Sequence, residues 1–178
     1  MNELQECHAL VWSFRKEIEP FWATPDPLNS LRYAFTEAAE AMDAWLRQNR
    51  PNDSRNNERQ NDVLDELADC AIMLLTAVNP DFIPEKIRYE NYFYNAISPE
   101  RYRLEALSHK ICNSLLSARN DDDEISLIYF MWIHDAIYAA KWIFDYPQMN
   151  LLERIKSRLA RIAVKHIPEE EDYKTNGV

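Results

Sequence analysis

Residues 62–78 read DVLDELADCAIMLLTAV, and residues 36–48 read TEAAEAMDAWLRQ. Both stretches have the apolar spacing of a helix, and each carries two acidic residues three positions apart. The four acids are Glu37, Glu40, Glu66 and Asp69. Residues three apart lie on one face of an α-helix, about one turn from each other. If the two helices form an antiparallel pair, the four carboxylates converge on one point.

The second stretch carries its acids toward the core. Asp62, Glu66 and Asp69 fall on one stripe of the helix, and residues 70–78 are apolar nearly all round. Converging, partly desolvated carboxylates repel one another and need a cation between them. All-oxygen ligation suits a hard divalent ion, so Mg²⁺ is the expected cofactor and Mn²⁺ the alternative. The competing interpretation is a pair of acidic helix faces exposed to solvent.

The composition excludes several classes of protein. The chain has 178 residues, 47% hydrophobic and 28% charged, and its single glycine is Gly177. Walker-type phosphate loops, dinucleotide fingerprints and tight hairpin turns all need glycine, so an all-α fold is favoured. The net charge of −10 argues against a nucleic-acid partner and against an anionic membrane surface.

Cysteine usage and the N-terminus predict a cytoplasmic protein. The three cysteines are Cys7, Cys70 and Cys112, which stand far apart in apolar helical contexts typical of a reducing compartment. The N-terminal sequence MNELQECHAL lacks the basic and apolar regions of a signal peptide. No apolar run is long enough to span a bilayer, so we expect no membrane association.

The remaining pattern predicts a bundle of about five to six helices with the acidic pair of helices at its centre. The expected helices cover roughly residues 3–19, 30–48, 58–78, 98–118, 124–145 and 149–166. We expect Asn29 or Ser30 to cap the second helix, whose core stripe includes Leu31, Phe35 and Ala38. A single domain over residues 1–167 and a loose polar tail over 168–178 complete the prediction. The segment 81–98 is rich in aromatic residues that suit helix packing, base stacking or a subunit interface.

Residues 28–80 resemble the MazG-like nucleoside triphosphate pyrophosphohydrolases, an all-α superfamily that includes the dimeric dUTPases. The resemblance lies in Glu37-x-x-Glu40, in Glu66-x-x-Asp69, and in the context LDELADCAIMLL. It implies that these four acids bind Mg²⁺ and that the substrate is a (deoxy)nucleoside triphosphate. Hydrolysis at the α–β anhydride would then yield a nucleoside monophosphate and pyrophosphate. It also implies a homodimer or homotetramer.

The chain departs from the family pattern EExxE at its first position, where it has Thr36. Threonine cannot act as the general base if that glutamate activates water in relatives. Asp43, Asp62 and Asp65 are possible substitutes, and Asp62 is the favoured one because it shares the stripe of Glu66.

Several polar residues outside the acidic pairs are candidates for substrate binding. Arg154, Arg158, Arg161 and Lys165 share one face of the last helix and suit a triphosphate, or form a basic surface near a helix C-terminus. The other candidates are Lys110, Asn113 and Asp135. Asp135 follows a histidine in an apolar helix, where a hydrogen-bonded core pair is the simpler interpretation.

Three alternative functions were weighed, the first of them implied by the resemblance. A dUTPase-like enzyme would prefer dUTP or dUDP. A degenerate relative, suggested by Thr36, would bind nucleotide or a partner protein without turnover. A di-iron carboxylate bundle is set aside because it requires Glu-x-x-His motifs, which the sequence lacks.

Overall fold

A computed structural model describes residues 3–48, 60–78 and 150–167, together with scattered positions between 104 and 115. Its helices are α1 (Glu3–Ile18), α2 (Pro27–Gln48), α3 (Gln60–Ala77) and α6 (Leu151–His166). The described positions between 104 and 115 are also helical, and no strand occurs in any of these segments. The all-α prediction is confirmed. The expected helix at 124–145, the aromatic segment 81–98 and the tail 168–178 lie outside the described residues.

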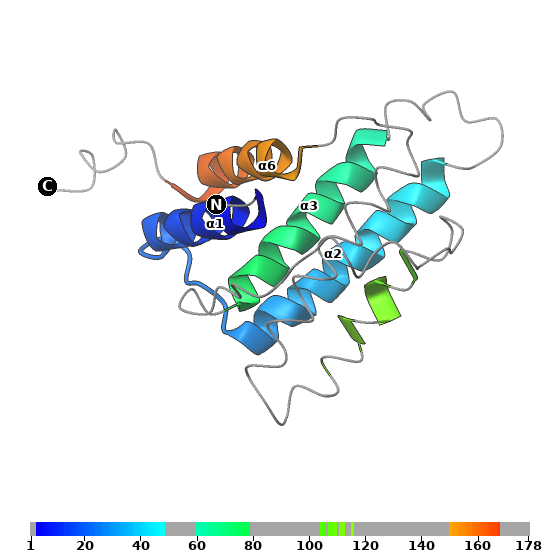
Figure 1. The fold of residues 1–178 in the computed structure, drawn as a ribbon, viewed down its shortest axis with the longest axis horizontal. Coiled ribbons are helices and arrows are strands. Elements are labelled where there is room, and N and C mark those ends of the chain that lie inside the picture. The colour runs from blue at the N-terminus through cyan, green and yellow to red at the C-terminus, as the bar shows by residue number, and fades with distance from the viewer. Residues whose placement is uncertain are drawn as a thin grey trace, which may run out of the picture.

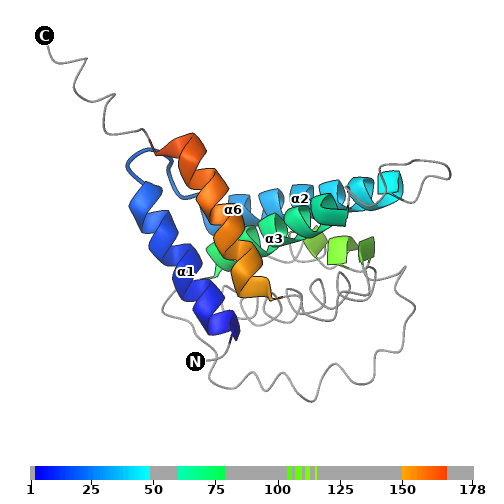
Figure 2. The same cartoon turned by 90° about the horizontal axis from the view of Figure 1, so that it is seen from above.

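The helices form two pairs that cross each other (Figures 1 and 2). α2 and α3 run antiparallel and make the most extensive contact among the described helices, as the acidic motifs predicted. α1 and α6 come from opposite ends of the sequence and lie side by side in the same direction (Figure 2). Both α1 and α6 also contact α3, which is therefore the helix that joins the two pairs.

α2 begins earlier than the sequence suggested, because Asp26 is its N-cap. The carboxylate of Asp26 accepts a hydrogen bond from the backbone N–H of Asn29 at 2.9 Å, and Pro27 takes the first helical position. Proline is favoured there, since its missing N–H would have no partner within the helix. The prediction that Asn29 or Ser30 caps this helix is wrong, and both residues lie inside its first turn.

The buried face of α2 is lined by small side chains. Its fully or almost fully buried residues are Ser30, Leu31, Ala34, Ala38, Ala41 and Ala44. Alanines let two helix backbones approach closely, so side chains beside this seam come near those of α3. Phe35 was expected in the core but is 38% exposed, because the contact is centred on the alanines rather than on the larger residues.

α3 is the most buried of the four helices α1, α2, α3 and α6. From Val63 onward its apolar side chains are almost completely buried, which explains why its C-terminal half is apolar on every side. Asp62 at its start is exposed, whereas Glu66 and Asp69 are half-buried. The predicted acidic stripe that runs from solvent into the core is confirmed.

α1 is tied to α3 through the buried guanidinium of Arg15. Its Nε donates to Thr76 Oγ1 at 3.3 Å, its Nη2 donates to Met73 Sδ at 3.3 Å, and Trp22 lies against it at 5.0 Å from the ring centroid. Nη1 of Arg15 has no hydrogen-bond partner among the described residues. Trp22 also stacks on His166, so the loop after α1 holds the C-terminal end of α6.

The N-terminus of α6 is fixed by two side chains. Asn150 is its N-cap, and the Asn150 side chain accepts from the N–H of Glu153 at 3.2 Å. Glu3 of α1 accepts from the N–H of Leu151 at 3.0 Å, which places a negative charge at the positive end of the helix dipole. These contacts fix the start of α6 and thereby the side chains that α6 turns toward α3.

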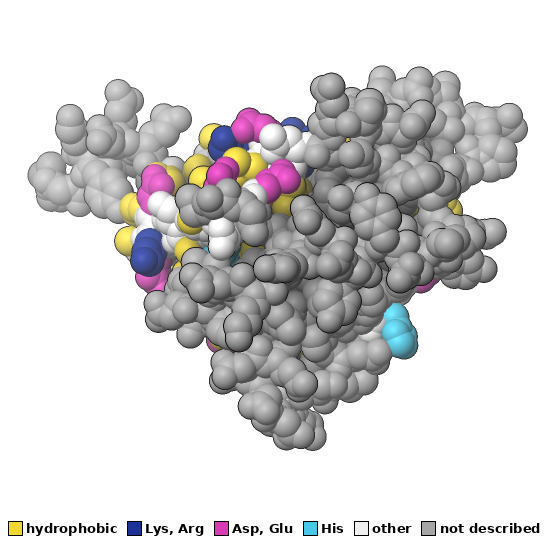
Figure 3. Space-filling model, viewed as in Figure 1, with side chains coloured by type: hydrophobic (Ala, Val, Ile, Leu, Met, Phe, Trp, Pro, Cys, Tyr) yellow, Lys and Arg dark blue, Asp and Glu magenta, His cyan; other side chains and the backbone are white. Residues whose placement is uncertain are grey.

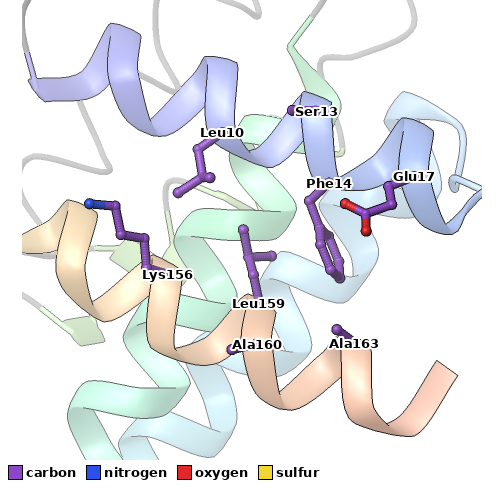
Figure 4. A pocket seen from close by; sticks show the side chains of 8 residues that line it. All are labelled: Leu10, Ser13, Phe14, Glu17, Lys156, Leu159, Ala160 and Ala163. Carbon is purple, nitrogen blue, oxygen red and sulfur yellow. The ribbon is translucent and has the colours of Figure 1, made fainter. Parts of the chain in front are cut away.

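The surface over α1 and α6 mixes acidic, basic and apolar side chains (Figure 3). A shallow groove of about 210 Å³ lies between these helices, floored by Leu10, Phe14 and Leu159 with Lys156 and Glu17 at its sides (Figure 4). No described helix has the length and apolar character needed to cross a membrane.

Candidate metal centre

Three of the four predicted ligands come together. Glu37 and Glu40 flank the alanine seam of α2, and Glu66 faces them from α3. One carboxylate oxygen from each of the three lies within 4.8 Å of the others. Glu37 and Glu66 are half-buried and Glu40 is exposed, so the cluster sits at the border between core and solvent. The antiparallel pairing of α2 and α3 thus produces the predicted convergence.

The cluster raises the pKa of its own members. Burial, with the nearby charges of Asp69, Glu40 and Glu66, raises the pKa of Glu37 to about 8. Burial and the charge of Asp69 also raise the pKa of Glu66, although Arg158 opposes the effect. Protonated Glu37 donates a hydrogen bond to Glu66. Without a cation, one proton therefore relieves part of the repulsion at neutral pH.

Asp69, the fourth predicted ligand, is held by α6 instead. Arg158 donates from Nε to Asp69 Oδ1 at 2.8 Å and from Nη2 to Asp69 Oδ2, which makes a two-bond pair. The hydrogen bonds to Asp69 and its charge raise the pKa of Arg158 above its ordinary value. Both side chains are largely shielded from solvent, with 19% and 16% exposed for Arg158 and Asp69. Bidentate arginine–carboxylate pairs are among the strongest polar contacts in proteins.

Asp65, one turn before Asp69, binds three arginines. Its carboxylate accepts from Arg154 at 3.1 Å, from Arg161 at 2.7 Å and from Arg158 at 3.3 Å. Asp65 is only 8% exposed, and a buried carboxylate requires such compensation. The basic face of α6 therefore neutralises Asp65 and Asp69. Across the described ranges, no lysine or arginine forms an ion pair with the three glutamates.

The glutamate cluster fits a hard divalent ion. Carboxylate oxygens are the ligands that Mg²⁺ and Mn²⁺ prefer, and ions of this kind keep several positions for water or phosphate oxygens. Two oxygens on opposite sides of one Mg²⁺ lie about 4.2 Å apart, so small side-chain rotations would bring the three groups onto one ion. The three glutamates would hold the ion, and its chemistry would be charge neutralisation and polarisation of a phosphate oxygen.

The candidates for the general base lie in different surroundings. Thr36 is exposed, and its hydroxyl donates to the Arg32 carbonyl of its own helix at 3.1 Å. Asp43 pairs with Arg47 at 2.9 Å on the exposed side of α2, and Asp65 is bound by the α6 arginines. Asp62 is exposed on α3, one turn before Glu66. Asp62 thus stays the favoured candidate among the three aspartates.

The predicted substrate-binding residues divide into two groups. Arg158 and Arg161 face α3 as described, and Arg161 is the more accessible of the two with 57% of its side chain exposed. Lys165 is exposed one turn further along α6. The predictions for Lys110, Asn113 and Asp135 lie outside the described residues and stay predictions.

The arginine–aspartate network is the part of the site that sequence reasoning missed. A signal existed, because Arg154 and Arg158 repeat the four-residue spacing of Asp65 and Asp69. Equal spacing on two helices allows paired contacts, but nothing in the sequence indicated that these two helices are neighbours.

Comparisons with protein-family models, with curated proteins and with solved structures find no match for this chain.

Proposed function

We propose that this protein binds Mg²⁺ or Mn²⁺ at Glu37, Glu40 and Glu66 and hydrolyses (deoxy)nucleoside triphosphates at the α–β anhydride. The observation that carries the proposal is the convergence of three carboxylates within 4.8 Å, while the two neighbouring aspartates already have arginine partners. Among the described residues around this point, the three glutamates therefore carry negative charge that no arginine or lysine pairs with. The resemblance of residues 28–80 to MazG-like enzymes supports the same function.

In the proposed reaction, water adds to the α-phosphorus and the bond from that phosphorus to the α–β bridging oxygen breaks. Pyrophosphate leaves with the bridging oxygen, the nucleoside monophosphate keeps the water oxygen, and the water protons pass to a base and to solvent. A bound divalent ion supplies charge neutralisation for the phosphates. Asp62 is the proposed base. Arg161, which pairs with Asp65 but is 57% exposed, and exposed Lys165 are the proposed phosphate-binding residues of α6.

Pyrophosphate release from a panel of nucleoside triphosphates tests the proposal. The panel contains NTPs and dNTPs, including dUTP, with Mg²⁺, and dUDP is assayed in parallel by orthophosphate release. A preference for dUTP and dUDP would favour the dUTPase-like variant. We expect Glu66→Gln to lower kcat by about a hundredfold or more, because removing one ligand of a metal centre weakens both binding and charge neutralisation. Glu153→Gln is the matched control, since Glu153 is exposed on α6 and pairs only with Lys156 in the described structure. Absence of pyrophosphate from every substrate would reject the enzymatic proposal.

A second candidate is a protein that binds metal and nucleotide without turnover. It is favoured by the hydroxyl of Thr36, which is bonded to its own helix, and by Asp69, which is bonded to Arg158. Calorimetry with Mg²⁺ and a non-hydrolysable triphosphate distinguishes the two. Binding that Glu66→Gln abolishes, together with no product from the hydrolysable substrates, would establish the non-catalytic function.

The homo-oligomer and the cytoplasmic location stay predictions. Tyr33, Phe35 and Leu46 leave apolar surface exposed on α2, which suits burial against another chain. Light scattering on the purified protein measures the oligomeric state, and a monomer at micromolar concentration would contradict the prediction.

A further inference from the structure

Asp69 lies beside the three-glutamate cluster but is engaged by Arg158 of α6. It lies one turn after Glu66 on the same face of α3, and it is the strongest charged influence on the pKa of Glu37. Nevertheless, Arg158 donates to both of its carboxylate oxygens. The guanidinium thus occupies the position of a cation beside the cluster.

Arg158 also has a second carboxylate within reach. Its Nη1 donates to Asp65 Oδ2 at 3.3 Å, while Nε and Nη2 hold Asp69. A guanidinium that leaves Asp69 would keep a charged partner in Asp65, which is itself buried and already binds Arg154 and Arg161. The usual obstacle to breaking a buried ion pair is the charge left unpaired, and here this penalty is reduced.

We propose that Arg158 is a built-in counter-ion that competes with the divalent cation for Asp69. With Arg158 on Asp69, the centre offers the carboxylates of the three glutamates. With Arg158 shifted to Asp65, it offers four. α6 therefore determines the ligand number of the centre. This inference rests on the proposed metal centre, and it makes Arg158 a positioning residue that acts through Asp69.

The competition follows from charge and geometry. A guanidinium and a divalent ion cannot both approach one carboxylate closely, because they repel each other and need the same oxygen lone pairs. A fourth anionic ligand also strengthens binding of a hard cation, since affinity rises with the number of charged ligands. Removing Arg158 should therefore tighten metal binding, but only while Asp69 is present.

A double-mutant cycle with Mn²⁺ tests this dependence. Mn²⁺ affinity is measured by electron paramagnetic resonance of the free ion for wild type, Arg158→Gln, Asp69→Asn and the double variant. We expect Arg158→Gln to tighten binding about tenfold in the presence of Asp69 and by less than about threefold in its absence. Lys156→Gln is the matched control, because it removes a positive charge of α6 that pairs with Glu153 and with neither Asp65 nor Asp69 in the described structure.

The outcomes separate this inference from the proposed metal centre. If Arg158→Gln changes Mn²⁺ affinity equally with and without Asp69, Arg158 acts only as a distant positive charge. That result would overturn the inference but leave the proposed metal centre in place. No Mn²⁺ binding by any variant would reject both. If Arg158→Gln fails to fold, the Mn²⁺ affinity of Asp69→Asn is compared with that of wild type instead. A change of less than about threefold in the Mn²⁺ affinity of Asp69→Asn supports the inference. A loss of about tenfold or more would mean that Asp69 already binds the metal in the wild-type protein, which overturns the inference.

Discussion

Metal binding to this protein should release a proton from Glu37 and should therefore depend on pH. The pKa of Glu37 is raised to about 8 by burial and by neighbouring carboxylates, and the raised pKa of Glu66 acts in the same direction. A metal ion binds the carboxylate and not the carboxylic acid, so below about pH 8 it must displace the proton that Glu37 holds.

The size of the effect follows from this single proton. Apparent affinity for Mn²⁺ should rise about tenfold for each pH unit below the pKa of Glu37 and level off above it. Between about pH 6 and about pH 9 the total change is about a hundredfold, or about 2.7 kcal/mol. An ordinary glutamate, with a pKa of 4.5, would already be ionised throughout this interval, and the affinity would be nearly constant.

Calorimetry in buffers of different ionisation enthalpy measures both the affinity and the released protons. We expect about one proton per Mn²⁺ at about pH 6.5, and none well above the pKa of Glu37. Glu37→Gln removes the titrating group and should bind more weakly with little pH dependence, whereas Glu153→Gln on the exposed side of α6 should behave like wild type. A flat affinity between about pH 6 and about pH 9 without proton release would refute the reasoning.

Three further predictions concern stability. Because folded Glu37 keeps its proton up to about pH 8 and the unfolded chain releases it near 4.5, the metal-free protein should lose stability as pH rises between these values. Glu37→Gln should therefore raise the free energy of unfolding of the metal-free protein by about 2 kcal/mol above about pH 8, a figure reduced for the partial exposure of this residue. Near pH 5 the same substitution should have little effect. Equal effects at the two pH values, measured by urea denaturation, would contradict this prediction. Leu74→Ala, at a fully buried position of α3, should cost about 2–5 kcal/mol in the same assay, and a loss below about 1 kcal/mol would show a looser core. Asn150→Ala removes the N-cap of α6 and should lower the free energy of unfolding by about 1 kcal/mol. An unchanged midpoint of urea denaturation would show that Glu3 alone suffices to cap the helix.

The central helix pair could be predicted from sequence because its signals are local. The spacing of Glu37 with Glu40, and the apolar run after Asp69, each require only the helical period to interpret. Their convergence also needed the antiparallel pairing of two helices separated by a short polar loop, which chain connectivity favours. The structure contains this pair with three of the four acids in contact range.

Two features were not predicted, the first because two local signals competed and the second because it depends on distant residues. The choice of Asp26 as N-cap depended on Pro27 taking the first helical position, a signal that competed with the polar residues after it. The partner of Asp69 is Arg158, which is separated from it by most of the chain. Sequence spacing shows that a carboxylate and a guanidinium could match, but only the packing of α6 on α3 makes them neighbours.

The central claim is that Glu37, Glu40 and Glu66 share one divalent cation. Anomalous scattering from a crystal soaked with Mn²⁺ tests it most directly. We expect one manganese peak between α2 and α3 with a carboxylate oxygen of each glutamate about 2.0–2.3 Å away. No peak at this place, or a manganese ion that contacts only one of the three, would contradict the account.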